Sequence, residues 1–592
     1  MYTLGINAAF HDSAACLVKD GVVVAAAEEE RFNRIKHAKR PVPFSAWELP
    51  FEAIDYCLGA AGVRLPDVEH VAYSFDPALM PGHRGSDHVR LPLEPSRAWS
   101  RPGSGTAEHG PWASPWEPLF HAYVLNAPRQ LTGGVPHHLR ARFAGALRDE
   151  TFKWHFVEHH LAHEASAFLA APFAGDDGTA VMTLDGRGER ATSTLAVWRD
   201  GVLTRLRQVD FPHSLGLLYE DVTRHLGFLH SSDEYKVMAL ASYGRPSCRE
   251  QLREAIELDG EGGYRVEPDA AGWLAARFGP PRPPGAALEG RHFDLAASLQ
   301  SVLEEVALEL AGWLHAHSRE TRLCMAGGVA LNCVMNARLR DAGLFDEVWV
   351  QPAAGDAGTA LGAALWTDYR ERGGPRRWQM DDAYLGPAYS DAEIEEALRW
   401  AKLPYRRMAD EAAEVAAILA EGRIVGWFQQ RMEFGPRALG ARSILASPLD
   451  ASMQARLNEL KDREDFRPVA PAVLEEAAAD WFMTADGKPP GAAPFMLFVF
   501  KVRPERAARI PAAVHVDATA RVQTVSARAN PRYHALLAAF GERTGVPVLI
   551  NTSFNVRGEP IVCRPRDAIA AFHSTPLDAL AIGPFLLEKE KR

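Results

Sequence analysis

Two histidines four residues apart carry the clearest chemical signal in this sequence. His159 and His163 fall within residues 157–171, where apolar residues recur at helical spacing and neither glycine nor proline intervenes. Side chains four apart lie on one face of a helix, so both imidazoles could bind a single ion. Such a pair is also common as a solvated or hydrogen-bonded pair without metal. The pair needs further ligands before it defines a metal site.

Two aspartates are the candidates for those further ligands. Asp185 and Asp356 each follow a predicted strand, and two imidazoles with one or two carboxylates suit Fe, Zn or Mn. If all four converge, the ion would neutralise nucleotide phosphates and polarise a carbonyl group. A metalloprotease shares this histidine spacing, but its HExxH motif requires a glutamate where His160 stands. The sequence excludes that chemistry.

A glycine pair marks a candidate nucleotide-binding turn. After a predicted helix over 293–318, the run TRLCMAGGVALN predicts a strand, a turn at Gly327 and Gly328, and a second helix. Paired glycines let the backbone approach a ligand, and a helix N-terminus favours an anion, although such turns also serve packing alone. A second turn of this kind, residues 355–358, contains Asp356.

The C-terminal half concentrates basic residues in loops next to apolar strands. Arginine binds phosphate and carboxylate through two parallel hydrogen bonds, so several in loops at strand ends indicate a site for a multiply charged small anion. A single loop arginine is often merely solvated. The residues are Arg437, Arg442, Lys461, Arg467, Arg521 and Arg557.

The elements that must position these groups form a repeated pattern. The first thirty residues predict three strands joined by polar turns, and residues 179–210 repeat this pattern, with Asn7 and Asp185 at equivalent strand ends. We infer two duplicated lobes, the architecture of the actin, sugar-kinase and heat-shock ATPase group, which holds a nucleotide between its lobes. Residues 81–140, rich in Pro, Gly, His and Trp, indicate an insertion or long loop. It would line an acceptor site or a dimer contact, or be a surface excursion.

Length and composition limit the class of protein. A chain of 592 residues with 47% hydrophobic and 24% charged residues predicts a globular protein of two to four domains. No apolar run or leader pattern indicates a membrane segment, so we expect a cytoplasmic protein. The six scattered cysteines predict reduced thiols. The net charge of −11 argues against nucleic acid as the main partner.

Nine motifs together resemble one known family. They resemble the nodulation-protein-U and cephamycin carbamoyltransferase family, which includes tobramycin carbamoyltransferase, and the likeness runs from Leu4 to about Glu588 except for the insertion. The motifs are GINAAFHDSAACLV, EEERFNRIKH, HHLAHEASAF, LDGRGE, AGGVALN, GDAGTALGAA, FGPRALGARSIL, RPVAPAV and NTSFNVRGEPIV.

The resemblance implies an α/β fold with two domains and a two-step reaction. Residues 1–375 would form a duplicated actin-like domain with ribonuclease-H-like lobes, similar to the tRNA threonylcarbamoyl transferase subunit. Residues 376–592 would form a domain similar to threonylcarbamoyl-adenylate synthases (YrdC-like). Carbamoyl phosphate and ATP, with Mg²⁺, would give carbamoyl adenylate and pyrophosphate in the second domain. The carbamoyl group would then pass, at the first domain's metal site, to the hydroxyl of a small molecule.

The resemblance also assigns residues to roles. It implies a metal site, with Fe(II) as the ion, at His159, His163, Asp185 and Asp356, and catalysis near the acceptor hydroxyl by His11. It places nucleotide binding at Lys236, Gly327, Gly328, Asn332 and Asp356. It places the carbamoyl phosphate and ATP site at Arg437, Lys461, Arg467, Arg521, Ser553 and Arg557. A homodimer is expected on the same ground.

The acceptor is the least determined part of the prediction. Tobramycin carbamoyltransferase has an acidic residue where this chain has Ala9, and a carboxylate there would suit a cationic amino sugar. Alanine in place of the acidic residue favours antibiotic-type tailoring of a less charged natural product, such as a macrolide or a sugar. An alternative is tRNA modification of the threonylcarbamoyl-transferase type, which the fused C-terminal domain and the acidic balance disfavour. A sensor that lost catalysis is disfavoured by the retained histidines, aspartates and arginines.

Overall fold

The chain folds into two compact units. The computed structural model describes residues 1–38, 48–80, 117–133, 152–173 and 178–589. One unit contains Met1–Asn33 and His37–Met380, and the other contains Arg34–Lys36 and Asp381–Arg592. The first unit extends five residues past the boundary expected at 375, and Arg376 and Met380 donate hydrogen bonds to the carbonyl oxygens of Phe168 and Ala170 in this unit. The six cysteines lie within the described residues and none of them forms a disulfide bond, in agreement with the predicted reduced thiols.

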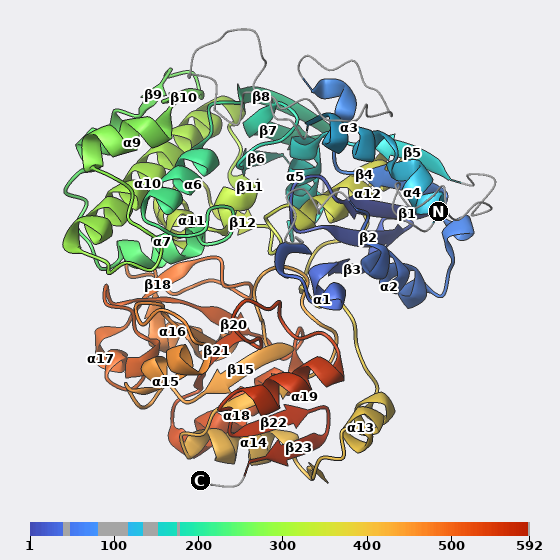
Figure 1. The fold of residues 1–592 in the computed structure, drawn as a ribbon, viewed down its shortest axis with the longest axis vertical. Helices are drawn as coiled ribbons and strands as arrows, with labels where there is room; N and C mark the ends of the chain where they lie inside the picture. Colours follow the sequence, from blue (N-terminus) through green and yellow to red (C-terminus); the bar gives the residue numbers. More distant parts are fainter. Residues whose placement is uncertain (39–47, 81–116, 134–151, 174–177, 590–592) are drawn as a thin grey trace. The chain divides into compact units, whose positions relative to one another are not determined.

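The first unit contains two five-stranded sheets with the same topology (Figure 1). In each, three consecutive strands form an antiparallel meander, and the first of them pairs with a parallel strand that pairs with another. The strand orders are β3-β2-β1-β4-β5 and β12-β11-β6-β7-β8. This shared order confirms the duplication predicted from the repeated hairpins. The strands are β1 (Tyr2–Asn7), β2 (Ala14–Lys19), β3 (Val22–Glu28), β4 (His70–Tyr73), β5 (Lys153–Phe156), β6 (Thr179–Leu184), β7 (Ala191–Arg199), β8 (Val202–Asp210), β11 (Arg322–Ala326) and β12 (Glu347–Val350).

Two helices pack between these sheets and place the predicted metal ligands. The helix α5 (His159–Phe168) contacts β6 and β11, while α12 (Ala357–Arg372) contacts β1 and β2, and the two helices contact each other. Gly362 permits the close approach, because a Cβ there would overlap the carbonyl oxygen of Ala162. Each lobe therefore contributes the helix that follows its last strand to the centre of the unit.

Of the remaining elements of the first unit, α2 contacts β2 and β3, and α10 contacts β6 and β7. The long helix α10 packs against α7, α8 and α11. These elements are α1 (Glu30–Asn33), α2 (Phe51–Ala61), α6 (Leu215–His225), α7 (Glu234–Ala241), α8 (Arg249–Arg253), β9 (Ile256–Leu258), β10 (Tyr264–Val266), α9 (Ala270–Phe278), α10 (Gly290–Ser318) and α11 (Cys333–Asp341).

The predicted insertion is partly helical. Residues 81–116 and 134–140 lie outside the described residues. Residues 117–133 form α3 (Glu117–Leu125) and α4 (Ala127–Gly133), so the prediction of a long loop is wrong for this part. Phe120, Val124 and Leu131 on these helices are buried, and this burial stabilises helices that the sequence pattern did not reveal.

The second unit is a mixed α/β fold built on one eight-stranded sheet. Its strand order is β13-β23-β22-β14-β15-β21-β16-β20, with β14 parallel to β22 and β16 parallel to β20. One hydrophobic cluster joins α14 and α18 to the sheet, and another joins α13, α15 and α19 to it. Successive strand residues such as Trp427 and Phe428 belong to different clusters, so helices cover both faces of the sheet.

The elements of the second unit run as follows in chain order. They are α13 (Asp391–Trp400), β13 (Arg406–Arg407), α14 (Glu411–Ala420), β14 (Val425–Phe428), β15 (Arg442–Ala446), α15 (Met453–Leu460), β16 (Ala470–Leu474), α16 (Ala478–Trp481), β17 (Phe482–Met483), β18 (Val499–Val502), α17 (Pro504–Ala507), β19 (Thr519–Arg521), β20 (Gln523–Val525), α18 (Pro531–Thr544), β21 (Val548–Ser553), α19 (Pro565–Ser574), β22 (Ala579–Ile582) and β23 (Phe585–Glu588). The short strands β17, β18 and β19 form a separate sheet. Within the described part of the chain, no helix has the length and apolar character needed to cross a membrane.

Candidate metal centre

Four predicted ligands converge in the first unit. The Nε2 atoms of His159 and His163 lie 3.2 Å apart. His159 Nε2 lies 3.5 Å from Asp185 Oδ2 and 3.5 Å from Asp356 Oδ1. The corresponding distances from His163 Nε2 are 3.9 and 3.8 Å. All four residues are buried. The two histidines belong to α5, Asp185 directly follows β6, and Asp356 directly precedes α12.

This geometry fits a bound transition-metal ion. Ligands about 2.1 Å from a tetrahedral ion lie about 3.4 Å from one another. The measured separations of 3.2 to 3.9 Å bracket that value. Among the described residues, the Oδ2 atom of Asp356 is buried without a hydrogen-bond partner, which is costly unless a cation lies nearby. The donor set of two imidazoles and two carboxylates suits a divalent first-row metal.

Neighbouring charges control the protonation of the cluster. Burial opposes protonation of His159, but Asp356 and Asp185 raise the pKa of this imidazole well above its ordinary value. Burial also opposes ionisation of Asp356, yet His11 and His159 hold the pKa of its carboxyl well below the usual range. The two carboxylates are therefore negative at neutral pH, and a divalent cation would replace the proton on His159.

Surrounding groups fix the ligands in place. The Glu189 carboxylate accepts the backbone N–H of His159, at 2.9 Å, and thereby caps α5. The backbone N–H of Gly328 donates to Asp185 Oδ1 at 2.7 Å, which leaves Oδ2 directed at the histidines. Gly327 has φ 91°, and a Cβ there would overlap the carbonyl oxygen of Leu184. Glycine is required at this turn.

His11 stands beside the cluster in a chain of hydrogen bonds. Its Nε2 lies 3.7 Å from Asp356 Oδ2, and its Nδ1 lies 2.8 Å from Asp12 Oδ2. The other oxygen of Asp12 lies 2.7 Å from Nδ1 of His37. The turn is held by the side-chain amide of Asn7, which donates to the backbone carbonyls of His11 and Asp12. One carboxylate therefore bridges two imidazoles, and the His11 side chain stays 34% exposed.

The remaining predicted nucleotide-binding residues have structural contacts. The Asn332 side chain caps α11 by accepting the N–H of Met335, and it donates to Gln300. Lys236 Nζ lies on α7, 3.1 Å from Asp233 Oδ2. Gly327 and Gly328 line the turn beside Asp185. The structure thus brings Gly328 into contact with Asp185 of the metal cluster and Gly327 into contact with Leu184, while the contacts of the Asn332 side chain are with Met335 and Gln300.

In the second unit, Lys461 is the centre of a cationic site. Its buried ammonium donates to Ser553 Oγ at 2.9 Å and to Asn555 Oδ1 at 2.6 Å. Burial, and then the guanidinium groups of Arg463 and Arg467, hold the pKa of Lys461 well below its ordinary value. A lysine without a carboxylate partner among these contacts is suited to binding an anion, because the anion would supply the missing counter-charge.

The other predicted basic residues differ in their position relative to Lys461. Arg557 pairs with Asp462, the neighbour of Lys461, at 2.8 Å. Arg437 lies in the loop before β15, where the carbonyl oxygen of Ala438 accepts a hydrogen bond from Asn551 of β21, the strand that ends at Ser553. Arg521 belongs to β19, in the separate three-stranded sheet.

Arg442 is a structural residue, contrary to its inclusion in the predicted anion site. It is fully buried, and its guanidinium lies 3.7 Å from the ring centroid of Phe428. It donates to backbone carbonyls, including that of Pro387 at 3.0 Å. The guanidinium therefore organises the loop before β15.

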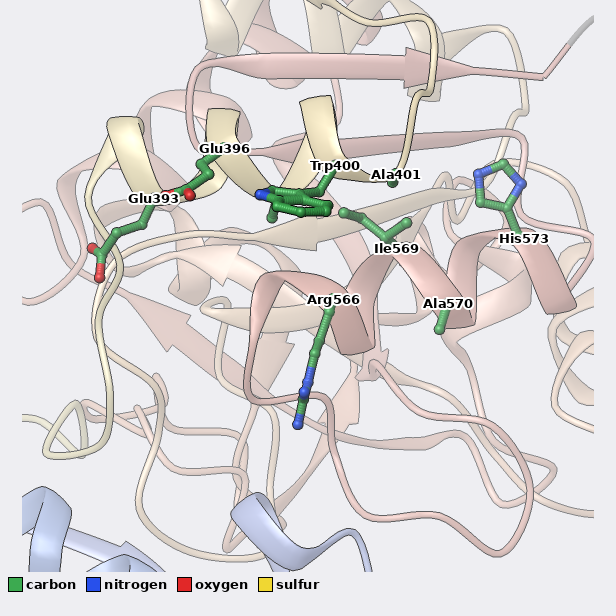
Figure 2. A pocket seen from close by; sticks show the side chains of 9 residues that line it. Glu393, Glu396, Trp400, Ala401, Arg566, Ile569, Ala570 and His573 are labelled. Atoms are coloured by element: carbon green, nitrogen blue, oxygen red, sulfur yellow. The ribbon is translucent and has the colours of Figure 1, made fainter.

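A surface groove of about 490 Å³ lies in the second unit between α13 and α19. Figure 2 shows the Trp400 indole beside Ile569, with Glu393 and Arg566 at the margins. None of its lining residues is a predicted site residue. The groove therefore contributes nothing to the assignment of the chemistry.

Comparison with known families agrees with this arrangement. The carbamoyltransferase N-terminus family model matches residues 2–78 and 141–365, and the carbamoyltransferase C-terminus model matches residues 416–589. The chain belongs to the carbamoyltransferase family. It is therefore an enzyme of carbamoyl transfer. The N-terminal match contains all four metal-cluster residues and His11, and it omits residues 79–140.

Curated relatives extend over nearly the whole chain. An uncharacterized protein of Synechocystis is 40% identical over 99% of this chain and 97% of its own length. Nodulation protein NolNO of Sinorhizobium fredii is 39% identical over 98% of this chain and 80% of its own length. Among solved structures, component A of (R)-2-hydroxyglutaryl-CoA dehydratase from Acidaminococcus fermentans is 14% identical over 63% of this chain and 99% of its own, with a TM-score of 0.33. A score this low adds nothing to the assignment.

Sequence reasoning missed three groups at this centre. Asp12 directly follows His11, and its position in FHDS was the available signal. Glu189 lies in the LDGRGE motif, but capping of a helix 30 residues earlier leaves no mark in the sequence. The third is His37, which reaches Asp12 only through the fold.

Proposed function

We propose that this carbamoyltransferase is ATP-dependent and works in two steps. In the first, carbamoyl phosphate, water and ATP with Mg²⁺ give carbamoyl adenylate, phosphate and pyrophosphate. In the second, the carbamoyl group passes from the adenylate to an acceptor hydroxyl and AMP leaves. The observation that carries the proposal is the presence of two different charged sites in one chain: a buried carboxylate–histidine cluster in the first unit and a buried lysine that donates to neutral acceptors in the second.

The second unit is proposed to form the adenylate. We infer that it is a YrdC-like domain in which Lys461, Ser553 and Arg467 bind phosphate oxygens, with Arg437, Arg521 and Arg557 contributing further positive charge. Support comes from the buried ammonium and from the two guanidinium groups that depress the pKa of Lys461. These cations would stabilise the charge that develops as pyrophosphate leaves.

The first unit is proposed to carry out the transfer. His159, His163, Asp185 and Asp356 would hold a divalent metal, with Fe(II) as our assignment, and a bound ion would neutralise phosphate charge and polarise the carbamoyl carbonyl. Gly327, Gly328, Lys236 and Asn332 are proposed to surround the nucleotide. His11 is the proposed base, because its partly exposed imidazole stands 3.7 Å from Asp356 and has a ring nitrogen directed away from Asp12.

The acceptor is proposed to be a hydroxyl of a small natural product. Ala9 takes the position of an acidic residue found in the tobramycin enzyme, so a polycationic amino sugar would lack a carboxylate partner at position 9. A macrolide or a sugar of low charge fits this site better. Modification of tRNA would instead require a threonylcarbamoyl donor, which the test below distinguishes.

The proposal is tested by measuring pyrophosphate release. Metal-loaded enzyme is incubated with ATP and Mg²⁺, with and without carbamoyl phosphate. We expect pyrophosphate release that requires carbamoyl phosphate. Release that requires threonine and bicarbonate instead would favour the tRNA alternative, and no release with either donor would refute ATP dependence.

Asp12 is predicted to orient His11 for its role as a base. By accepting a hydrogen bond from Nδ1–H, its carboxylate leaves the lone pair on Nε2 and stabilises the imidazolium that forms. Asp12→Asn removes the charge but keeps the size. It should slow AMP release from supplied carbamoyl adenylate by about 100-fold or more, with water as the acceptor. Pyrophosphate release should stay within about twofold of wild type, since the first step does not use His11.

The control for Asp12 is its second histidine partner. His37→Asn keeps a side-chain N–H near Asp12 Oδ1 and should reduce AMP release far less than Asp12→Asn. Wild-type AMP release by Asp12→Asn would show that the carboxylate has no part in the transfer.

A further inference from the structure

The insertion helix α3 reaches the transfer centre through one aromatic ring. Phe120 stacks on Phe10, with ring centroids 6.0 Å apart and an interplanar angle of 17°. It also contacts Phe75 edge-on at 5.2 Å. Phe120 is 6% exposed and Phe75 is fully buried, so these rings belong to the interior of the first unit. The described part of the insertion is therefore not a surface excursion.

Phe10 connects this helix to the chemistry. It is the chain neighbour of His11, and its ring meets the imidazole of His159 edge-on at a centroid distance of 5.3 Å. Phe75 packs against it at 5.6 Å, and the guanidinium of Arg187 lies 5.6 Å from its centroid. The orientation of Phe10 thus affects both the proposed base and a proposed metal ligand.

The support for Phe10 comes from a segment outside the matched part of the N-terminal family model. That model matches residues 2–78 and 141–365, so it leaves all of α3 unmatched. His121 links α3 to the rest of the first unit, because its Nε2 lies 3.4 Å from the carbonyl oxygen of Pro77. The residues that the family model matches can perform the common chemistry, while an element beside them can adapt the site to a particular acceptor.

We propose that Phe120 is a positioning residue that fixes Phe10 between His11 and His159, so that the insertion completes the transfer centre. This inference rests on the proposed function. Removal of the Phe120 ring leaves a cavity beside Phe10, and the loss of two aromatic contacts lets the Phe10 ring tilt. Small displacements of a catalytic group are costly, since a shift of about 1 Å can reduce a rate by about 100-fold.

The test measures both steps in Phe120→Ala. The kcat for AMP release from supplied carbamoyl adenylate should fall about tenfold, with KM for carbamoyl adenylate within about twofold of wild type. Pyrophosphate release from ATP and carbamoyl phosphate should be unchanged within about twofold. The matched control is Phe345→Ala, another buried phenylalanine of the first unit, which precedes β12 at the end away from Asp356. It should leave both rates at the wild-type level.

A double-mutant cycle separates positioning from general loss of stability. If Phe120 acts through Phe10, the pair Phe10→Leu and Phe120→Ala should lose no more activity than the more damaged single variant. Losses that multiply, or a wild-type kcat in folded Phe120→Ala, would overturn the inference. If thermal melting shows that Phe120→Ala is unfolded, Phe120→Leu replaces it under the same criteria. A wild-type enzyme that releases no pyrophosphate would refute the proposed function and not this inference alone.

Discussion

Replacing His163 by alanine should abolish carbamoyl transfer and leave adenylate formation intact. The variant removes one of four converging ligand atoms, so metal content measured by mass spectrometry should fall to background. AMP release from supplied carbamoyl adenylate should fall about 100- to 1,000-fold, because Lewis-acid stabilisation is worth several kcal/mol. Pyrophosphate release should remain within about twofold of wild type, since the basic site lies in the other unit.

The matched control lies on the same helix. His160 is equally buried, but its Nδ1 lies 2.7 Å from Thr183 Oγ1 rather than in the cluster. Burial holds the pKa of His160 well below its ordinary value, so its neutral ring can be replaced by another neutral polar side chain. His160→Gln should keep both the metal and transfer. Equal loss of both steps in His163→Ala would contradict the assignment of one step to each unit.

Replacing Lys461 by methionine should have the opposite effect. The variant removes a buried ammonium that binds Ser553 and Asn555, and with it the charge proposed to hold phosphate oxygens. Pyrophosphate release should fall by about 100-fold or more, the cost of losing a preorganised charge in a buried site. AMP release from supplied carbamoyl adenylate should stay near the wild-type rate. Methionine resembles the lysine stem in length, so the fold should tolerate it.

An exposed lysine of the same unit provides the comparison for Lys461. Lys501 lies on β18, and its Nζ donates to the backbone carbonyl of Ala485. Lys501→Met should leave both rates unchanged. If Lys461→Met instead slowed transfer from supplied adenylate as much as it slowed pyrophosphate release, Lys461 would not belong to the first step.

The convergence of the metal ligands could be predicted because local sequence signals specify each of them. The helical period places His159 and His163 on one face, Asp185 directly follows β6, and Asp356 ends the connection from β12 to α12. The duplication predicted from the hairpins implied that these connections meet at the centre, and the matching strand orders confirm it. Short-range periodicity and repetition were sufficient for this part of the fold.

Contacts between distant segments could not be predicted in the same way. Asp12 and His37 are 25 residues apart and meet only because the chain returns to the end of β1. In the sequence Arg442 resembles the other loop arginines. In the structure its guanidinium packs on Phe428 and donates to the carbonyl of Pro387, so its role is structural. Phe120 lies in a segment without a clear period, and burial against Phe10 and Phe75 stabilises its helix.

The most direct test of the two-step account is the detection of carbamoyl adenylate itself. The His163→Ala enzyme is mixed with carbamoyl phosphate labelled with ¹⁴C and ATP labelled at the α-phosphate, and the quenched mixture is separated by chromatography. The account predicts a product that carries both labels and accumulates in step with pyrophosphate. Pyrophosphate release without any doubly labelled product would contradict it.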